Sequence, residues 1–269
     1  MRMFVTTVVG GRDRPALPFG RVMDLPGRGT TFVRDLTGPR DAPVVMLLHG
    51  WSATADLNWH PCFVPLSRHF RVLAMDHRGH GRGLRDDRPF RLEDCADDVA
   101  AVAGQLGIER MIVVGYSMGG PIAQLLWRRH SALVDGLVLC STGAAFASTP
   151  RLRALFRVAG GLSATGASAA VSSIATGALG AVGRINGRRG DVPWGVEQIA
   201  MHDWRRLIEA GHRIGRYDAR DWIGSISVPT AVVATTEDDV VPPAQQLALA
   251  AAIPGASLRE LPTGHHGCV

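Results

Sequence analysis

The chain has 269 residues, 46% of them hydrophobic, which is enough for one large globular core. All 29 basic residues are arginine, which excludes a Schiff-base lysine, a pyridoxal-phosphate lysine and the lysine of a phosphate-binding loop. The formal net charge is +5, but the arginines are spread among acidic residues and only 6% of residues are aromatic, so nucleic-acid binding is not expected.

The N-terminal segment and the cysteines bear on the compartment. The apolar stretch of residues 4–9 is too short for the core of a signal peptide. Cys62, Cys95, Cys140 and Cys268 show no Cys-x-x-Cys spacing, which indicates neither a zinc site nor a redox pair. We therefore expect a cytoplasmic protein with free thiols and without a metal or other cofactor.

From residue 43 onward, short apolar runs alternate with helix-like runs. This alternation is typical of an α/β fold with a mostly parallel sheet and helices on both of its faces. Strands are predicted at residues 43–48, 70–75, 111–114, 133–140, 230–235 and 257–261, with residues 31–36 and part of the first twenty as an antiparallel edge. Helices are predicted at residues 61–69, 92–106, 118–130 and 242–253.

The first strand of the core runs into His49-Gly50-Trp51. Gly50 allows the chain to bend back, so the backbone N–H of Trp51 is a candidate donor to an oxyanion. The indole ring of Trp51 is equally well explained as part of the core or of a cleft wall.

Polar residues after the second strand and on the following helix have simple structural interpretations. His77 and His80 flank an Arg-Gly turn, and they suggest a metal pair only weakly because no third ligand is evident. Asp94, Asp97 and Asp98 lie opposite the apolar face of the predicted helix, which indicates a solvated helix face.

Residues 115–120 read Gly-Tyr-Ser-Met-Gly-Gly, between an apolar strand and a helix. Such a sharp strand-to-helix turn needs small residues two before and two after its centre, here Gly115 and Gly119. The turn presents the hydroxyl of Ser117 at the sheet edge as a candidate nucleophile. The N–H of Met118, at the start of the helix, is a second candidate oxyanion donor.

Residues 143–224 interrupt the alternation and are predicted to be an insertion. Residues 158–183 carry no charge, yet only six of them are Val, Leu or Ile, so stable membrane insertion is not expected and a thin packed helix is favoured. Arginines on both sides leave contact with a membrane surface open. Trp194, Trp204, Tyr217 and Trp222 indicate lid helices whose aromatic side chains line a pocket or simply hold the lid to the core.

A nucleophilic serine needs a histidine base and an acid that orients this base. His265, in the loop after the last strand, is the best candidate for the base, and its neighbour His266 is the rival. Three carboxylates follow the strand at residues 230–235: Asp238 is preferred, then Asp239, then Glu237.

Together these motifs resemble those of the α/β-hydrolase superfamily, in the branch with a helical cap after the sixth strand. The resemblance covers nearly the whole chain and rests on residues 49–51, 76–81 and 115–120, and on Asp238 with Gly264-His265. It implies a core of residues 1–142 and 225–269, a cap of residues 143–224, and a structural role for residues 76–81. It also favours Asp238 over Asp239, because in the family the acid lies four residues before a proline, here Pro242.

The resemblance implies a Ser117-His265-Asp238 triad with an oxyanion hole of the Trp51 and Met118 N–H groups. We expect a serine hydrolase that cleaves a carboxylic ester of a small-molecule acyl substrate through an acyl-enzyme. Cofactor-free haloperoxidase (perhydrolase), carbon–carbon hydrolase, lactonase and acyltransferase activities share this triad and stay open, as does a ligand-binding protein with little or no catalysis. The oligomeric state is open as well.

The resemblance has one departure, at the end of the sequence. Family members usually carry a further helix after the histidine loop, whereas this sequence ends at Val269. We therefore expect the loop of His265 to be less firmly held than in the family.

Overall fold

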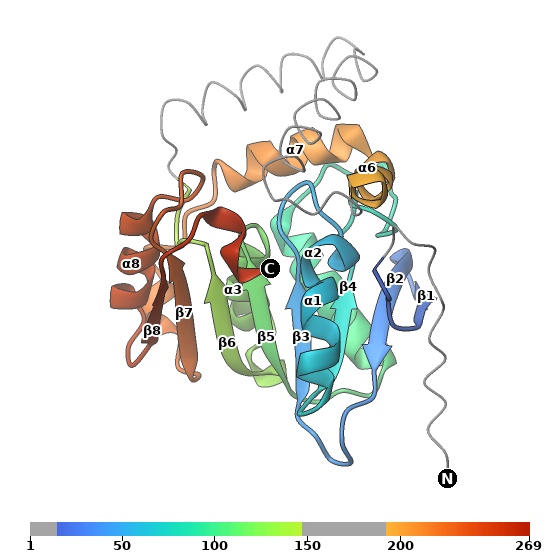
Figure 1. The fold of residues 1–269 in the computed structure, drawn as a ribbon, viewed down its shortest axis with the longest axis horizontal. Helices are drawn as coiled ribbons and strands as arrows, with labels where there is room; N and C mark the ends of the chain where they lie inside the picture. The colour runs from blue at the N-terminus through green and yellow to red at the C-terminus, as the bar shows by residue number, and fades with distance from the viewer. Residues whose placement is uncertain (1–14, 147–191) are drawn as a thin grey trace.

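The structure is a computed structural model, which describes residues 15–146 and 192–269. In these ranges the chain forms an eight-stranded sheet flanked by helices (Figure 1). The strand order is β1-β2-β4-β3-β5-β6-β7-β8. The strands are β1 (Gly20–Leu25), β2 (Gly29–Leu36), β3 (Val44–Leu48), β4 (Arg71–Met75), β5 (Met111–Tyr116), β6 (Val134–Cys140), β7 (Thr230–Thr235) and β8 (Ser257–Leu261).

The sheet is antiparallel at one edge and parallel elsewhere. Strand β2 pairs antiparallel with both β1 and β4, whereas every pair from β4 through β3 to β8 is parallel. The predicted α/β fold is therefore confirmed, and so is an antiparallel edge that includes residues 31–36, but its outer strand is Gly20–Leu25, of which only Gly20 falls within the first twenty residues. Because β3, β5, β6 and β7 run in one direction, the loops that follow them converge at one end of the sheet, where ligands bind in open α/β sheets.

Helices cover both faces of the sheet and lie across one end of it (Figure 1). They are α1 (Ala55–Ser67), α2 (Leu92–Gln105), α3 (Gly119–Arg129), α6 (Val192–Ala200), α7 (Trp204–Ile214) and α8 (Pro243–Ala252), with the short 3₁₀ turns η1 (Ser131–Leu133), η2 (Ile223–Ser225) and η3 (His265–Cys268).

Helix α1 begins six residues before the predicted start at residue 61. Two prolines, Pro61 and Pro65, lie inside the helix, and the predicted start coincides with the first of them because proline is common in the first turn of a helix. The structure instead caps the helix with Thr54, whose side chain accepts a hydrogen bond from the Leu57 N–H.

Two apolar clusters hold the sheet, one on each face. Alternate residues of β3 divide between them: Met46 and Leu48 pack with α2 and α3, whereas Val45 and Leu47 pack with α1. This division follows from the period of two along a strand, and it explains why the buried strands read as continuous apolar runs.

Hydrogen bonds attach the α6–α7 segment to loops at the carboxyl end of the strands. The Thr54 hydroxyl donates to Gln198, and the indole N–H of Trp51 donates to the Leu207 carbonyl at 2.8 Å. The Gly81 N–H donates to Nδ1 of His202 at 2.9 Å. These bonds lie at the end of the sheet where a cap is expected.

The aromatic side chains of this segment also contact the core. Trp194 packs edge-on against His60 of α1, Tyr217 donates to Gln124 of α3, and the guanidinium of Arg128 lies over the ring of Trp222. These contacts agree with the role of holding the segment to the core. The predicted helix at residues 158–183 lies outside the described residues.

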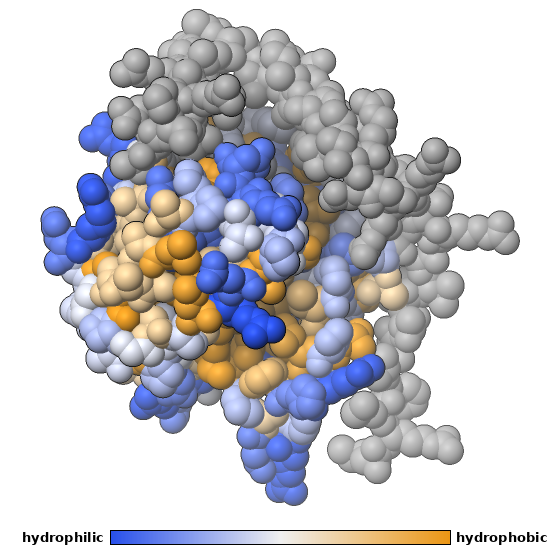
Figure 2. All heavy atoms as spheres, turned by 60° about the vertical axis from the view of Figure 1, so that its left-hand side comes forward, coloured by the Kyte–Doolittle hydropathy of each residue, from blue (hydrophilic) through white to orange (hydrophobic). Residues whose placement is uncertain are grey.

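Strand β8 forms the second edge of the sheet, beside α8. Leu258 of β8 and Leu247 of α8 are partly exposed, at 43% and 38%. Figure 2 turns this side forward and shows apolar surface bordered by hydrophilic side chains. In the described part of the chain, no helix has both the length and the apolar character needed to cross a bilayer.

Candidate active site

Ser117 lies between β5 and α3 in a sharply bent turn. Its φ of +50° is in the left-handed region, which is costly for a non-glycine residue. A Cβ at Gly115 would collide with the Gly119 carbonyl, and a Cβ at Gly119 would collide with the Leu48 carbonyl. The two glycines are therefore required by close backbone contacts, and the turn presents Ser117 half-buried at the end of the sheet.

His265 and Asp238 meet Ser117 in a continuous chain of hydrogen bonds. Nε2 of His265 lies 3.0 Å from the Ser117 hydroxyl oxygen, and Nδ1 lies 2.8 Å from Oδ2 of Asp238. Because an ionised carboxylate only accepts, Nδ1 is the donor and Nε2 is left to accept from the hydroxyl. The structure thus brings together three residues that lie up to 148 positions apart in the sequence.

Asp238 is the one buried residue of the three candidate acids, with 6% of its surface exposed, whereas Glu237 and Asp239 are exposed. Burial would raise the pKa of Asp238, but hydrogen bonds from His265, the Val241 N–H and Thr235 outweigh it and lower the pKa. The carboxylate is therefore held ionised against the imidazole.

The loop after β3 lies directly against Ser117. A Cβ at Gly50 would lie 2.9 Å from the Tyr116 ring and 3.3 Å from the Ser117 Cβ. Trp51 follows Gly50, and Met118 occupies the N-cap of α3 with helical φ and ψ of −54° and −33°. The two candidate oxyanion donors therefore lie on segments that meet beside Ser117.

A family profile described as alpha/beta hydrolase fold matches residues 43–180, more than half of the 269 residues. The chain belongs to the α/β-hydrolase fold family.

Among its relatives in this family, the chain is 44% identical over 84 residues to a bifunctional esterase/perhydrolase of Acinetobacter calcoaceticus, a match over 31% of this chain and 30% of that protein. It is 35% identical over 115 residues to a non-heme chloroperoxidase of Streptomyces lividans, over 42% and 41% of the two chains. The chain thus matches less than half of the length of these relatives. The crystal structure of the enol-lactonase from Burkholderia xenovorans LB400 superposes with a TM-score of 0.76 at 25% identity, covering 93% of this chain and 94% of that one.

Two polar residues that the sequence did not indicate hold the carboxylate of the candidate acid, Asp238, in place. Thr235 and Gln246 donate to Oδ2 of Asp238 at 2.8 and 3.0 Å. Gln246 lies on α8, eight residues after Asp238, and only the packing of α8 on β7 turns it toward the carboxylate. No local pattern in the sequence marks it.

Tyr116 holds the loop that carries His265. Its hydroxyl donates to the His265 carbonyl at 3.2 Å and lies 2.9 Å from Nδ1 of His266. The rival base His266 therefore faces Tyr116 and not Ser117. The two contacts of Tyr116 attach this loop directly to β5. Whether the loop is less firmly held than in the family stays a prediction.

The histidines of residues 76–81 pack against other histidines in the core. The ring centroid of His49 lies 4.3 Å from that of His77 and 5.4 Å from that of His80, and His80 lies 5.4 Å from His202. Burial lowers the pKa of all four, to about 4 for His49 and His202. Among the described residues no three or more His, Cys, Asp or Glu side chains are grouped to hold a metal ion.

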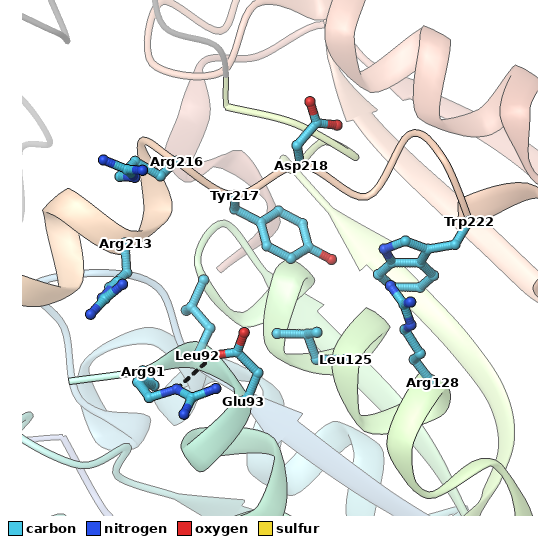
Figure 3. A pocket seen from close by; sticks show the side chains of 10 residues that line it. All are labelled: Arg91, Leu92, Glu93, Leu125, Arg128, Arg213, Arg216, Tyr217, Asp218 and Trp222. Carbon is cyan, nitrogen blue, oxygen red and sulfur yellow. Dashed lines mark ion pairs between the residues drawn. The ribbon is translucent and has the colours of Figure 1, made fainter. Parts of the chain in front are cut away.

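A hollow of about 550 Å³ lies between α2, α3 and the end of α7 (Figure 3). Four arginines and two aromatic residues contribute to its wall: Arg91, Arg128, Arg213, Arg216, Tyr217 and Trp222. None of the described residues that line it belongs to the loops that carry Ser117, Asp238 or His265. Its charged wall makes it a poor site for an apolar acyl chain.

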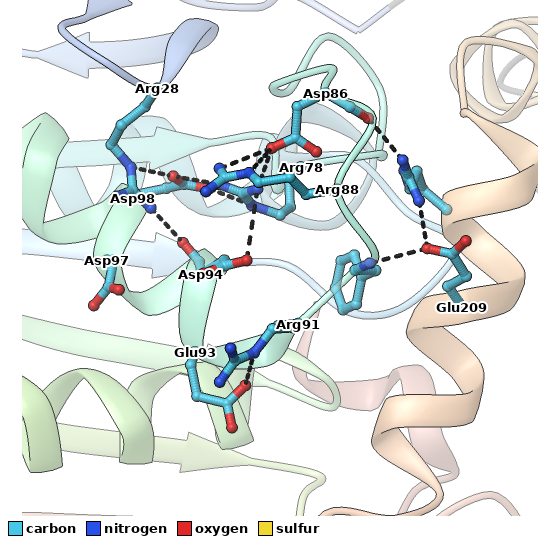
Figure 4. A network of polar contacts seen from close by, with 12 residues as sticks. Arg28, Arg78, Asp86, Arg88, Arg91, Glu93, Asp94, Asp97, Asp98 and Glu209 are labelled. Atoms are coloured by element: carbon cyan, nitrogen blue, oxygen red, sulfur yellow. Dashed lines mark hydrogen bonds and ion pairs between the residues drawn. The ribbon is translucent and has the colours of Figure 1, made fainter.

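The predicted solvated face of α2 is wrong for Asp98. This carboxylate is fully buried and pairs with Arg28 and Arg78 at 2.7 Å (Figure 4). Asp97 pairs with Arg129 on the surface side of the helix, at 2.8 Å. Amphipathic spacing missed the burial of Asp98 because its partners come from the loop before β2 and the turn after β4, not from α2.

Proposed function

We propose that this chain is a serine hydrolase that cleaves carboxylic esters of small acyl substrates, with Ser117 as nucleophile, His265 as base and Asp238 as orienting acid. The observation that supports it best is the chain of hydrogen bonds from Asp238 through His265 to Ser117, at 2.8 and 3.0 Å. A serine, a histidine and an aspartate in these contacts match the nucleophile, the base and the orienting acid that acyl transfer requires.

In the proposed reaction, the hydroxyl oxygen of Ser117 attacks the ester carbonyl while Nε2 of His265 takes its proton. Charge develops on the carbonyl oxygen, and the N–H groups of Trp51 and Met118 donate to it. His265 then gives the proton to the departing alcohol, which leaves an acyl group on Ser117. A water molecule, deprotonated by His265, releases the acid and restores the hydroxyl. Asp238 stabilises the imidazolium that forms in both halves.

We also propose that residues 143–224 form a cap over a core of residues 1–142 and 225–269. The support is the set of bonds from α6 and α7 to the loops of Trp51, Thr54 and Gly81. A cap in this place would shape the pocket for the acyl group and exclude water from the oxyanion.

A second activity, perhydrolysis, is favoured by the likeness to the bifunctional esterase/perhydrolase. The same acyl-Ser117 would then be attacked by hydrogen peroxide in place of water, giving a peracid. Both activities need the same triad, so they differ only in which nucleophile the pocket admits.

Covalent labelling by a fluorophosphonate probe tests the nucleophile. We expect one label per chain, mapped to Ser117, and none in Ser117→Ala. Ser225→Ala, at an exposed serine of η2, is the matched control and should label like the original chain. Folded protein that takes no label would overturn the enzyme proposal and favour a ligand-binding protein.

Turnover of p-nitrophenyl esters of increasing chain length then measures the size of the acyl pocket. Loss of Ser117 should lower kcat by about 10⁴-fold or more. Adding hydrogen peroxide and assaying peracid separates the two activities. A peracid yield equal to that of the uncatalysed mixture would remove perhydrolysis.

A further inference from the structure

The hollow between α2, α3 and the end of α7 is a concave surface apart from the loops of the proposed triad. Its volume of about 550 Å³ lies within the range of small-ligand sites, roughly 300 to 1,000 Å³. Figure 3 shows Tyr217 in the middle of its wall, with Arg213 and Arg216 on one side. Arg128 and Trp222 lie on the other side. A second hollow, of about 310 Å³, adjoins the first, since Arg213 and Arg216 line both.

Two arginines of this wall differ from the arginines of the core in having no carboxylate partner. Arg34 and Arg78 are buried, and each pairs with a carboxylate at 2.7 Å. Arg213 and Arg216 are exposed, and neither pairs with a carboxylate of the described residues. Nε of Arg213 donates to the Phe90 carbonyl at 3.1 Å. Most of the N–H donors on these two guanidiniums are therefore left for a solute.

The two acidic residues of the wall have arginine partners of their own. Nε of Arg91 lies 3.6 Å from Oε2 of Glu93. Asp218 accepts from Nε of Arg220 at 2.9 Å. Each negative charge is thus matched by a positive one, and the two unpaired arginines give the wall a surplus of positive charge.

The end of α7 acts against an anion, because the last carbonyls of a helix carry partial negative charge. Here the carbonyls of Gly211, Arg213 and Ile214 accept from backbone N–H groups at 3.0 to 3.2 Å. The two guanidiniums also carry full charges, against roughly half a charge at a helix end. The balance at this end of the hollow therefore favours an anion.

The other side of the hollow is apolar and aromatic. Leu92 and Leu125 are buried, and the rings of Tyr217 and Trp222 are half-buried. The guanidinium of Arg128 lies over the Trp222 ring, 4.6 Å from its centroid. Such a surface packs well against a flat ring, because aromatic rings and guanidinium planes both stack on π-faces. The hollow therefore combines a cationic end with a flat apolar one.

We propose that this hollow binds a phosphate monoester of a flat aromatic group, such as a nucleoside monophosphate. The phosphate lies against Arg213 and Arg216, and the aromatic group lies over Tyr217 and Trp222. A phosphate monoester carries nearly two negative charges at neutral pH, which matches the two unpaired arginines, whereas a carboxylate carries one. Guanidinium groups also bind phosphate oxygens through paired N–H donors.

The proposed site is separate from the proposed active site. None of the described residues that line it lies on the loops of Ser117, Asp238 or His265. Binding of the phosphate monoester therefore does not depend on ester hydrolysis, and either proposal can fail while the other stands.

Isothermal titration calorimetry of the full chain, with adenosine 5′-monophosphate as the probe, tests the ligand class. We expect saturable binding with a Kd below about 1 mM at low ionic strength. Adenosine and inorganic phosphate, which each lack one half of the probe, should bind at least tenfold more weakly. Adenosine-5′-carboxylic acid, which carries one charge in place of two, should also bind more weakly. No saturable binding of the monophosphate, or equal binding of adenosine or of the carboxylic acid, would overturn the proposal.

Variants then place the probe in the hollow. The side chain of Arg216 makes no hydrogen bond or ion pair with the described residues, so Arg216→Gln should fold with an unchanged Tm and weaken binding about tenfold. Trp222→Leu should weaken it as well. Arg259→Gln, at an exposed arginine of β8, is the control for net charge and should keep the original Kd. Equal weakening in Arg259→Gln and Arg216→Gln would mean general charge attraction and would overturn the site.

Ser117→Ala separates the hollow from the active site. This variant should bind the monophosphate with the original Kd, whether or not the chain is an esterase. Lost binding in Ser117→Ala, together with an unchanged Kd in Arg216→Gln, would place the probe at the triad and overturn the proposal.

Discussion

Two clusters of buried polar side chains follow the carboxyl ends of strands in this chain, and they are built differently. In one, Asp238, His265 and Ser117 form a line of single hydrogen bonds that ends on a half-buried hydroxyl. In the other, the turn after β4 joins Arg78, Asp98, Arg28 and Asp86 into a network (Figure 4). Both contain charges that would be costly to bury alone.

The two clusters differ in which groups their hydrogen bonds satisfy. Asp98 accepts from two arginines and is fully buried, so the ionic cluster has its charges neutralised internally. In the proposed triad, the hydrogen bonds orient one imidazole nitrogen of His265 toward the hydroxyl of Ser117. This hydroxyl is left available to a substrate. Similar residue types thus stabilise a turn in one cluster and, under the proposed function, would activate Ser117 in the other.

The largest expected effect separates Asp238, the proposed orienting acid, from its neighbour Asp239. Asp238→Asn should lower kcat by about 10³ to 10⁴-fold, because the amide nitrogen facing Nδ1 favours the wrong tautomer of His265. Asp239→Asn, one residue along and exposed, should leave kcat within about twofold. Steady-state kinetics with p-nitrophenyl esters measure both. Equal losses in the two variants would contradict the assignment of Asp238.

The next effect concerns stability. Asp98→Asn removes the fully buried carboxylate that Arg28 and Arg78 share and leaves Arg78 with Asp86 as its remaining close carboxylate, so the free energy of unfolding should fall by about 3 kcal/mol. Asp97→Asn weakens contacts with Arg129 and His130 on the surface side of α2 and should cost no more than about 1 kcal/mol. Urea titrations followed by circular dichroism compare the two variants. A cost for Asp97→Asn as large as that for Asp98→Asn would mean that burial does not separate these pairs.

A smaller effect comes from the buried histidines beside the ionic cluster. The pKa of His202 is lowered to about 4, because burial outweighs every other influence, and an unfolded histidine titrates near 6.5. Between these values the unfolded state binds the proton and the folded state does not, so stability falls as the pH drops from 6.5 to 4. The loss from this residue is about 3 kcal/mol at most.

His202→Asn tests this loss, since the asparagine oxygen can replace Nδ1 as acceptor for the Gly81 N–H but does not titrate. His49, Asp76 and Arg85 also influence the pKa of His202. The readout is therefore the slope of unfolding free energy against pH in the variant compared with that in the original chain, and not the slope of either chain alone. The variant should lose less unfolding free energy than the original chain between pH 6.5 and 4.5. His212→Asn, at an exposed position on α7, should keep the original slope. If His202→Asn keeps the original slope, proton binding by His202 does not cause the loss of stability at low pH.

The sequence alone determined the order of strands and helices and the segments where chemistry is concentrated. Apolar runs of five to seven residues and helical spacing are local patterns, so β7 and β8 match their predicted bounds. The Gly-x-Ser-x-Gly pattern is a local signal as well, since it can be recognised within one short segment between a strand and a helix. Of its glycines, Gly115 is required by a contact inside the turn, whereas Gly119 is required by the Leu48 carbonyl of β3.

Only the tertiary structure decided which polar groups share a surface. Gln246 supports Asp238, Asp98 is buried between two arginines, and the Cys268 thiol meets the Ser141 hydroxyl from the other end of the chain. Each of these contacts depends on the register of parallel strands and on the packing of a helix against them. Periodicity gives the face on which a side chain lies but not its partner, because the partner comes from elsewhere in the chain.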